Sequence, residues 1–302
     1  MNDIRFDVLV CEHLGVSREY AKELILGGKC MVAGKIIIKP GAKFPSDTEI
    51  VINAEKNPYV SRGGLKLAKA LDAFQINLNG LLCLDIGAST GGFTDCMLAH
   101  GAKKVIALDN GRNQLNPALV EDCRVISLEE KDIRHTTLQD LPWQPQFITC
   151  DVSFISLEKI IPSVSLLLKS GTDAVFLLKP QFECGVKELN KKGVVKSTKA
   201  HVYAINHILK CLLDNKLLIL GITFSPITGQ GGNIEYLIYA RKTHEIVGSA
   251  IHTLSMSKEE KNAANRSNRS AFFSSRMKWK EYQSIDINET VRTAHESLRG
   301  SK

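Results

Sequence analysis

The sequence lacks any apolar run long enough to cross a membrane. A membrane-spanning helix needs about 20 consecutive, mostly apolar residues, and no run of even eighteen occurs here. The first residues, Met1-Asn2-Asp3-Ile4-Arg5, also lack the apolar core of a signal peptide. We therefore expect a cytoplasmic protein that has no membrane partner.

The eight cysteines form no C-x-x-C pair. Closely spaced cysteines would indicate a zinc site or, in a small secreted protein, a disulfide framework. Cysteines scattered in this way are typical of small apolar side chains buried in a protein of a reducing compartment. We therefore expect no metal site and no disulfides.

The chain also has no acidic excess, since its formal net charge is +7. A basic balance indicates an anionic partner such as nucleic acid. The excess is uneven, however: residues 1–60 have no net charge, whereas residues 241–302 hold twelve basic and seven acidic residues. Net charge alone therefore supports nucleic-acid binding only weakly, because a solvated basic tail explains much of it.

A strand–turn–helix pattern occupies residues 81–98. An apolar run ends at Asp85, a glycine-spaced loop follows over 87–92, and helical apolar spacing begins at Phe93. This order is typical of the first unit of a doubly wound α/β domain. The glycines let the backbone approach a ligand, and the helix N-terminus offers free N–H groups.

The glycine spacing separates two kinds of nucleotide ligand. Dinucleotide enzymes use G-x-G-x-x-G, but here Gly87 is followed by Gly91 and Gly92. We favour S-adenosylmethionine, which carries no phosphate, over a nicotinamide dinucleotide; a turn that binds no ligand is the remaining alternative. The next strand ends at Asp109, where an acidic residue usually hydrogen-bonds a ribose diol.

Further apolar segments complete a seven-stranded sheet. They are residues 104–109, 125–128, 147–155, 174–178, 217–225 and 234–240. Polar residues follow several of them, and ligands bind at the carboxyl edge of such a sheet. Asp151 and Lys179 end two strands at this edge. Asp132 follows the third strand and is a candidate for the adenine contact, although a loop acid without a ligand fits equally well.

Residues 1–56 form a separate unit in which short helical and strand patterns alternate. Cations gather on its second helix and in its turns: Arg18, Lys22, Lys29 and Lys35. A one-sided basic surface is suited to phosphates, and an ordinary solvated face is the alternative. Residues 57–63 are expected to be a linker, 64–242 the α/β domain, and 243–302 a basic, flexible tail.

The first unit resembles the alpha-L RNA-binding motif, the small α+β domain shared with ribosomal protein S-four. The matching residues are Ser17-Arg18-x-x-Ala21-x-x-Leu24-Ile25-x-x-Gly28-x-x-x-Val32-x-Gly34-Lys35-x-x-x-Lys39-Pro40. The resemblance implies that its four cations contact structured RNA. Arg62, in the linker, adds a fifth candidate RNA contact.

Five motifs in order along the chain resemble the TlyA-type rRNA methyltransferases, which are often labelled hemolysins. They are Ser61-Arg62-Gly63-Gly64-x-Lys66, Asp85-Ile86-Gly87-x-Ser89-Thr90-Gly91-Gly92-Phe93, Cys150-Asp151-Val152-Ser153-Phe154-Ile155-Ser156, Lys179-Pro180-Gln181-Phe182-Glu183 and Gly231-Gly232-Asn233-x-Glu235. The catalytic domain of this family is FtsJ-like, with a Rossmann-like fold. The chain departs from the family at Asp132, where relatives often carry Asn.

The resemblance implies methyl transfer from S-adenosylmethionine to the 2′-hydroxyl of a cytidine in ribosomal RNA or a ribosomal subunit. The catalytic tetrad would be Lys66, Asp151, Lys179 and Glu235, with Lys179 as the base. The residues implied to bind the cofactor are Asp85, Gly87, Ala88, Ser89, Gly91, Phe93, Asp109, Asp132 and Asp151. Two other kinds of function stay open: an RNA-binding ribosome-assembly factor without catalysis, and a membrane-active hemolysin.

Overall fold

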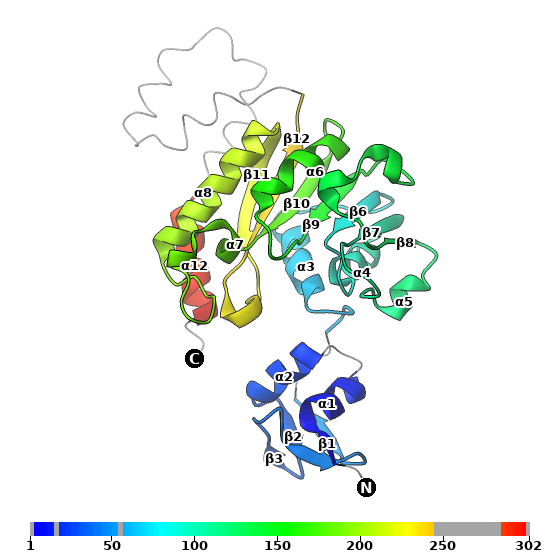
Figure 1. The fold of residues 1–302 in the computed structure, drawn as a ribbon, viewed down its shortest axis with the longest axis vertical. Helices are drawn as coiled ribbons and strands as arrows, with labels where there is room; N and C mark the ends of the chain where they lie inside the picture. Colours follow the sequence, from blue (N-terminus) through cyan, green and yellow to red (C-terminus); the bar gives the residue numbers. More distant parts are fainter. Residues whose placement is uncertain (1–2, 15–17, 54–56, 245–284, 300–302) are drawn as a thin grey trace. The chain divides into compact units, whose positions relative to one another are not determined.

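The computed structural model describes residues 3–14, 18–53, 57–244 and 285–299 (Figure 1). It divides the chain into two compact units, Met1–Gly64 and Leu65–Lys302. No helix in these described ranges is both long and apolar enough to cross a membrane.

The first unit packs two helices against two small antiparallel sheets, with strand orders β1-β4 and β3-β2-β5. Its elements are β1 (Asp3–Arg5), α1 (Phe6–Leu14), α2 (Arg18–Leu26), β2 (Cys30–Val32), β3 (Lys35–Ile36), β4 (Lys43–Pro45) and β5 (Ile50–Ile52). A small core holds the unit together: Phe6, Leu9, Val10, Ala21, Leu24, Ile25, Cys30 and Ile50. Strand β1 was not expected from the sequence. It forms because Ile4 pairs with Phe44, whose ring lies 5.1 Å from that of Phe6.

The second unit is built on a seven-stranded sheet of order β11-β12-β10-β9-β6-β7-β8. The strands are β6 (Leu82–Ile86), β7 (Lys104–Leu108), β8 (Val125–Leu128), β9 (Phe147–Cys150), β10 (Asp173–Leu178), β11 (Leu217–Phe224) and β12 (Tyr236–Lys242). Neighbours from β8 to β10 are parallel, and β12 runs antiparallel to both β10 and β11. The predicted doubly wound, seven-stranded fold is confirmed.

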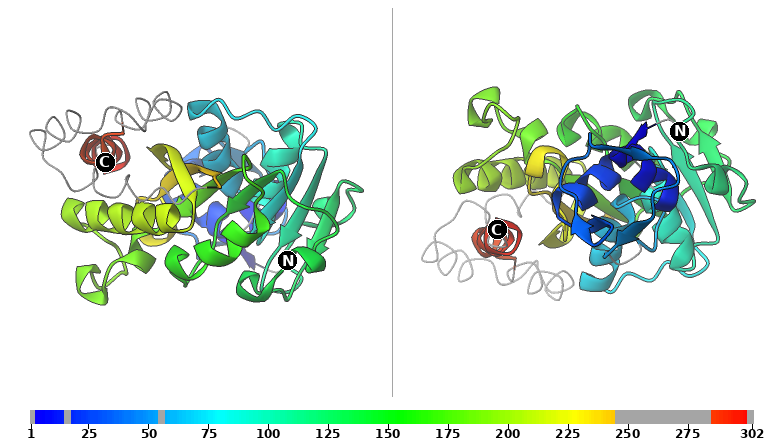
Figure 2. Two further views of the ribbon diagram at one scale, coloured as in Figure 1. Left: turned by 90° about the horizontal axis from the view of Figure 1, so that it is seen from above. Right: turned by 90° about the horizontal axis from the view of Figure 1, so that it is seen from below.

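Helices cover both faces of this sheet (Figures 1 and 2). They are α3 (Gly63–Ala73), α4 (Gly92–Ala99), α5 (Pro117–Val120), α6 (Ile161–Leu167), α7 (Pro180–Glu183), α8 (Thr198–Asp214) and α12 (Ile287–Arg299), with short 3₁₀ turns at Ile133–His135, Leu138–Asp140, Leu157–Lys159, Val186–Glu188 and Gln230–Gly232. Successive residues of β12 alternate between the faces. Ile238 joins the core beneath α6 and α8, whereas Tyr239 stacks on Phe74, which directly follows α3.

The helix α12 corrects the expectation of a flexible tail for residues 285–299. Its buried Val291 and Ala294 join the core formed by α8 and β11, and Figure 2 shows α12 beside α8. The cause is a spacing that the sequence reading overlooked: Ile287, Val291, Ala294 and Leu298 repeat every three or four residues, which places them on one helix face. The rest of the predicted tail, residues 245–284, lies outside the described residues.

Candidate active site

A cavity of about 570 Å³ opens where the parallel strands of the second unit end. Loops after four adjacent strands line it: Gly87 and Ser89 follow β6, Asp109, Asn110, Gly111 and Gln114 follow β7, Lys131 to Arg134 follow β8, and Asp151 to Ile155 follow β9. The carboxyl edge of a doubly wound sheet is where ligands bind. The structure therefore places the candidate site at the edge that the sequence predicted.

The loop after β6 depends on glycine at its first position. Gly87 has a φ of +80°, and a Cβ there would lie 2.4 Å from the backbone oxygen of Asp151. No other residue allows this close approach without a shift. The loop is fixed further because the N–H groups of Gly87 and Ala88 both donate to the Leu108 carbonyl. A bare backbone therefore forms one wall of the cavity.

Asp109 presents its carboxylate at the rim of this cavity. It accepts the Ser89 N–H at 2.8 Å and the Gly111 N–H at 2.7 Å, one on each oxygen. A carboxylate oxygen can accept two hydrogen bonds, so both oxygens keep capacity for a diol. This geometry fits the ribose contact that the sequence predicts for a bound adenosine group.

Asp132 also lines the cavity, but Arg134 already engages it. The guanidinium contacts both carboxylate oxygens, the shorter distance being 2.6 Å. These hydrogen bonds hold the pKa of Asp132 at about 2, against the opposing effect of burial. An adenine amino group would have to share these oxygens with Arg134. The predicted adenine contact therefore stays a prediction.

Four of the residues predicted to bind the cofactor do not line the cavity: Asp85, Ala88, Gly91 and Phe93. Asp85 is completely buried and accepts the hydroxyls of Thr94 at 2.7 Å and Thr149 at 2.9 Å. Burial raises its pKa to about 7. Asp85 thus joins β6 to α4 and β9 beneath the loop. Asp85 therefore supports the loop from below, and its predicted cofactor contact, like those of Ala88, Gly91 and Phe93, stays a prediction.

The four residues of the predicted tetrad lie together as two ion pairs. Lys66 Nζ lies 2.6 Å from Glu235 Oε2, and Lys179 Nζ lies 2.7 Å from Asp151 Oδ1. They come from α3 and from the ends of β9, β10 and β12. Their side chains are 3–18% exposed. Burial raises the pKa of Asp151, but Lys179 and Lys66 outweigh it and hold that pKa below its usual range. Both lysines therefore act on one carboxylate, and the two pairs form a single cluster.

A tight turn before β12 fixes Glu235. A Cβ on Gly229 would lie 1.9 Å from Glu235 Oε1, so the carboxylate packs directly on that glycine. The turn is closed by the Gly229 N–H, which donates to the Asn233 carbonyl at 2.8 Å. The Asn233 side chain in turn accepts the Val195 N–H and donates to the Gly193 carbonyl. The sequence analysis did not identify this support.

Two cavity residues beside the tetrad were also missed. Ser153 accepts a hydrogen bond from Lys179 Nζ at 2.6 Å. Phe154, which is 82% exposed, has a φ of +63° and lies with its ring 5.5 Å from that of Phe182. A left-handed φ is uncommon for an aromatic residue and concentrates at functional sites. The available signal was their place inside the motif that begins at Cys150.

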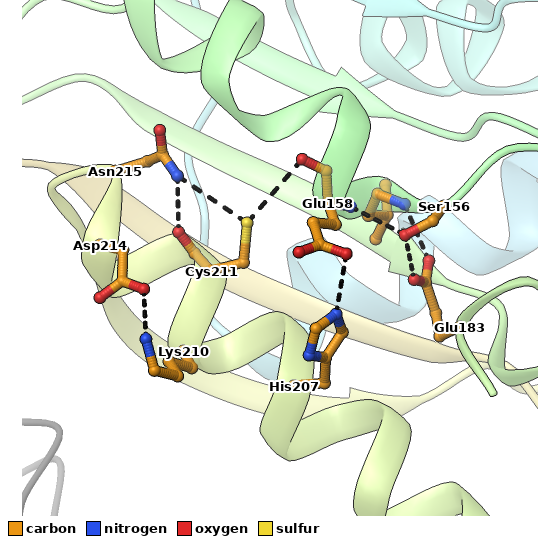
Figure 3. Close-up of polar contacts among 9 residues, drawn as sticks. Ser156, Glu158, Glu183, His207, Lys210, Cys211, Asp214 and Asn215 are labelled. Carbon is orange, nitrogen blue, oxygen red and sulfur yellow. Dashed lines mark hydrogen bonds and ion pairs between the residues drawn. The ribbon is translucent and has the colours of Figure 1, made fainter. Parts of the chain in front are cut away.

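Glu183 connects the two segments that carry Asp151 and Lys179 (Figure 3). Its carboxylate accepts the Ser156 hydroxyl at 2.6 Å and the Leu157 N–H at 2.8 Å. Burial raises the pKa of Glu183, partly offset by these hydrogen bonds. Because Glu183 ends α7, which directly follows Lys179, it holds the segment after β9 against the segment after β10.

The cations predicted to bind RNA in the first unit have different surroundings. Lys29 and Lys35 are exposed, and Lys22 is half-buried. Arg18 is 47% exposed and pairs with the buried Asp7 at 3.0 Å, so part of its charge is neutralised. The Arg62 guanidinium lies 5.6 Å from the centre of the Tyr20 ring. Their RNA contacts stay predictions.

No group of three or more His, Cys, Asp or Glu side chains is arranged as a metal site within the described part of the chain.

Several known proteins are similar to this chain in sequence, and a solved structure is similar to it in fold. The chain is similar to "Hemolysin A" of Brachyspira hyodysenteriae, with 42% identity over 74% of this chain and 93% of the relative. It is 36% identical to the "16S/23S rRNA (cytidine-2'-O)-methyltransferase TlyA" of Mycobacterium tuberculosis, over 77% of this chain and 87% of the relative. A solved structure from Streptococcus thermophilus that is labelled a hemolysin superposes with a TM-score of 0.72 at 35% identity, covering 99% of this chain and 98% of that one.

A family description matches the segment that holds the cavity and the tetrad. Residues 59–242 match the FtsJ-like methyltransferases, and this range includes every strand of the seven-stranded sheet. The methyl donor of such enzymes is S-adenosylmethionine, which agrees with the cavity and with the open acceptor sites of Asp109. The chain belongs to the FtsJ-like methyltransferase family.

Proposed function

We propose that this protein methylates the ribose 2′-hydroxyl of a cytidine in ribosomal RNA, in the cytoplasm. The observation that carries the proposal is the pair of buried lysine–carboxylate contacts beside the cavity. The relative from Mycobacterium tuberculosis is named a (cytidine-2'-O)-methyltransferase, which supports cytidine as the nucleoside and the 2′-hydroxyl as the acceptor.

The cavity residues would hold the methyl donor. When bound, S-adenosylmethionine supplies a methyl group that is activated by its sulfonium. Asp109 accepts hydrogen bonds from the adenosine ribose with the capacity left on its two oxygens. Gly87 forms the wall that brings this ligand close to Asp151. Fixing donor and acceptor in one geometry supplies much of the rate enhancement in a reaction of this kind.

The tetrad would act on the acceptor. A ribose hydroxyl hardly ionises near neutral pH, so a base beside it accelerates the transfer. We assign that role to Lys179, whose Nζ takes the 2′-hydroxyl proton. Asp151 stays paired with the ammonium that results, so this charge does not become isolated in a buried site. Lys66, held by Glu235, offers a hydrogen bond to the acceptor nucleotide.

The first unit would hold the RNA. The exposed Lys29 and Lys35 are suited to phosphate contacts, and Arg18, Lys22 and Arg62 are the further candidates. The exposed ring of Phe154 at the cavity offers a stacking surface for an unstacked base.

The decisive experiment is methyl transfer with purified protein. Small and large ribosomal subunits are incubated separately with S-adenosylmethionine carrying a labelled methyl group, and the nucleosides are then analysed by mass spectrometry. We expect labelled 2′-O-methylcytidine in at least one subunit. If the protein bound S-adenosylmethionine and ribosomal subunits but incorporated no methyl group into RNA, it would be a ribosome-assembly factor without catalysis. Leakage of lipid vesicles without methylation would favour the hemolysin.

A further inference from the structure

We propose that Ser153 is a positioning residue that aims Lys179 at the acceptor hydroxyl. This inference rests on the proposed function, because it concerns the same proton transfer. Ser153 lies outside the four residues that the tetrad supplies.

Ser153 gives Lys179 a directed contact. Lys179 Nζ donates a hydrogen bond to Ser153 Oγ at 2.6 Å, and it lies 2.7 Å from Asp151 Oδ1 as an ion pair. Asp151 Oδ1 accepts no hydrogen bond from the described residues, so Asp151 holds the ammonium by charge without fixing the direction of an N–H group. The hydrogen bond to Ser153 therefore sets how the tetrahedral nitrogen is turned.

The ion pair with Asp151 could not give this restriction. Without a directed hydrogen bond, the ammonium can rotate about its Cε–Nζ bond, and its other positions turn with it. The hydrogen bond to Ser153 stops that rotation. Ser153 is two residues beyond Asp151 in the loop after β9, and its exposed position leaves the hydroxyl at the cavity where the reaction would occur.

The loop that carries Ser153 is itself fixed on both sides. Before it, the Asp151 N–H donates to the Ile86 carbonyl at 2.9 Å. After it, Ser156 and the Leu157 N–H donate to Glu183 (Figure 3). Between these anchors, the left-handed φ of Phe154 turns the chain sharply. The Ser153 hydroxyl is therefore held by more than its own contact with Lys179.

The chemistry follows from these positions. In the reactive form Nζ is neutral, one N–H group donates to Ser153, and the lone pair occupies a position whose direction this hydrogen bond fixes. The 2′-hydroxyl proton moves to that lone pair while its oxygen forms a bond to the methyl carbon. The bond from sulfur to that carbon breaks, and its electrons stay on sulfur, which becomes a neutral thioether. Lys179 ends as an ammonium with three N–H groups.

The test compares Ser153→Ala with Ser153→Thr, using Ser170→Ala as the matched control. Ser170 is an exposed serine in the turn before β10, at the opposite edge of the sheet. A misdirected catalytic group can cost on the order of 100-fold in rate. We therefore expect Ser153→Ala to lower kcat by about 10–100-fold, with the RNA KM and the Kd for S-adenosylmethionine unchanged. Ser153→Thr restores the hydroxyl and should recover most of the turnover, whereas Ser170→Ala should match the unchanged protein.

Each other result counts against the inference. Unchanged kcat in Ser153→Ala would overturn it, and so would a loss that Ser153→Thr shares in full, because side-chain volume would then be the cause. A rise in KM without a fall in kcat would assign Ser153 to RNA binding instead. A failure of the proposed function can be distinguished from these results, because the unchanged protein would then not methylate RNA at all.

Discussion

The lysines proposed to act in catalysis and those proposed to bind RNA have opposite environments. In the second unit, the side chains of Lys66 and Lys179 are only 12% and 9% exposed, and each lies within 2.7 Å of a carboxylate oxygen. In the first unit, Lys29 and Lys35 are exposed to solvent. A buried charge is stable only with a close partner, and its interactions are strong because little water screens them. An exposed charge keeps its hydration and is screened by salt.

This difference in environment corresponds to two different roles of lysine, catalysis and phosphate binding. Paired and buried lysines are fixed to within a hydrogen bond, which suits proton transfer and orientation. Exposed lysines attract phosphates from a distance and release counterions when they bind. Changes in the second unit should therefore act on kcat at any salt concentration. Changes in the first unit should act on KM, and should do so in a salt-dependent manner.

The largest effect is expected from Lys179→Ala. It removes the proposed base, and general base catalysis contributes roughly 100- to 10,000-fold. We expect kcat to fall by that factor at both low and high salt, while calorimetry shows nearly intact binding of S-adenosylmethionine. The matched control is Lys169→Ala, which changes an exposed lysine before β10 and should retain full activity. Retained turnover in Lys179→Ala would refute its role as base.

A smaller but still large effect is expected from Gly229→Ala. The added Cβ would lie 1.9 Å from Glu235 Oε1, so the carboxylate must move away from Lys66. We expect kcat to fall about 10–100-fold, with a stability loss of about 1–3 kcal/mol from the forced packing. Both are measurable, by methyl incorporation and by urea unfolding.

Gly185→Ala is the control for this substitution. Gly185 has no neighbour within 4 Å of the added Cβ and no positive φ, so its replacement should leave both quantities unchanged. If Gly229→Ala kept full turnover, the position of Glu235 would not matter for the transfer.

Much of the second unit could be predicted because its strands are short, continuous apolar runs. A parallel strand covered by helices on both faces has no polar side, so β9 and β10 are visible as strings of apolar residues that end at Asp151 and Lys179. Once strand order is assumed, those ends must meet at one edge. The meeting of Asp151 and Lys179 therefore followed from local patterns plus one rule of topology, whereas Lys66 and Glu235 were assigned through the family resemblance.

The remaining features depend on contacts between distant segments. Asp85 is buried in support of the loop, and one of the hydroxyls that it accepts comes from Thr149, 64 residues away, which no local pattern reveals. The contact between Gly229 and Glu235, the rotamer that joins Lys179 to Ser153, and the left-handed φ of Phe154 likewise have no periodic signal. The helix α12 did have one, but the composition of the tail obscured it.

A moderate effect is expected from replacing Lys29 and Lys35 together with glutamine. If both contact phosphates, the RNA KM should rise several-fold, and the slope of log KM against log salt should decrease by about 1 for each lysine. The catalytic constant should stay unchanged, because the tetrad is untouched. Lys103→Gln with Lys169→Gln removes two exposed charges from the second unit and serves as the control. If the two double variants had equal salt slopes, Lys29 and Lys35 would not contact RNA phosphates.

The smallest effect on turnover is expected from Asp7→Asn, which tests a buried charge of the first unit. Hydrogen bonds from Arg5 hold the pKa of Asp7 at about 2 despite burial, with further help from Arg18. Because this pKa lies below the ordinary value of 3.8, the ion pairs stabilise the unit above about pH 4 and lose that contribution as the pH falls toward 2. Hydrogen exchange of α1 and α2 amides in the full chain should therefore show stronger protection than in Asp7→Asn at pH 7, and the difference should shrink below pH 4. Methyl transfer at pH 7 should change little beyond a slight fall in KM, because Arg18 freed from Asp7 carries its full charge. A difference in protection that stays constant down to pH 2 would mean that Asp7 acts through packing, and that charge pairing is confined to the catalytic unit.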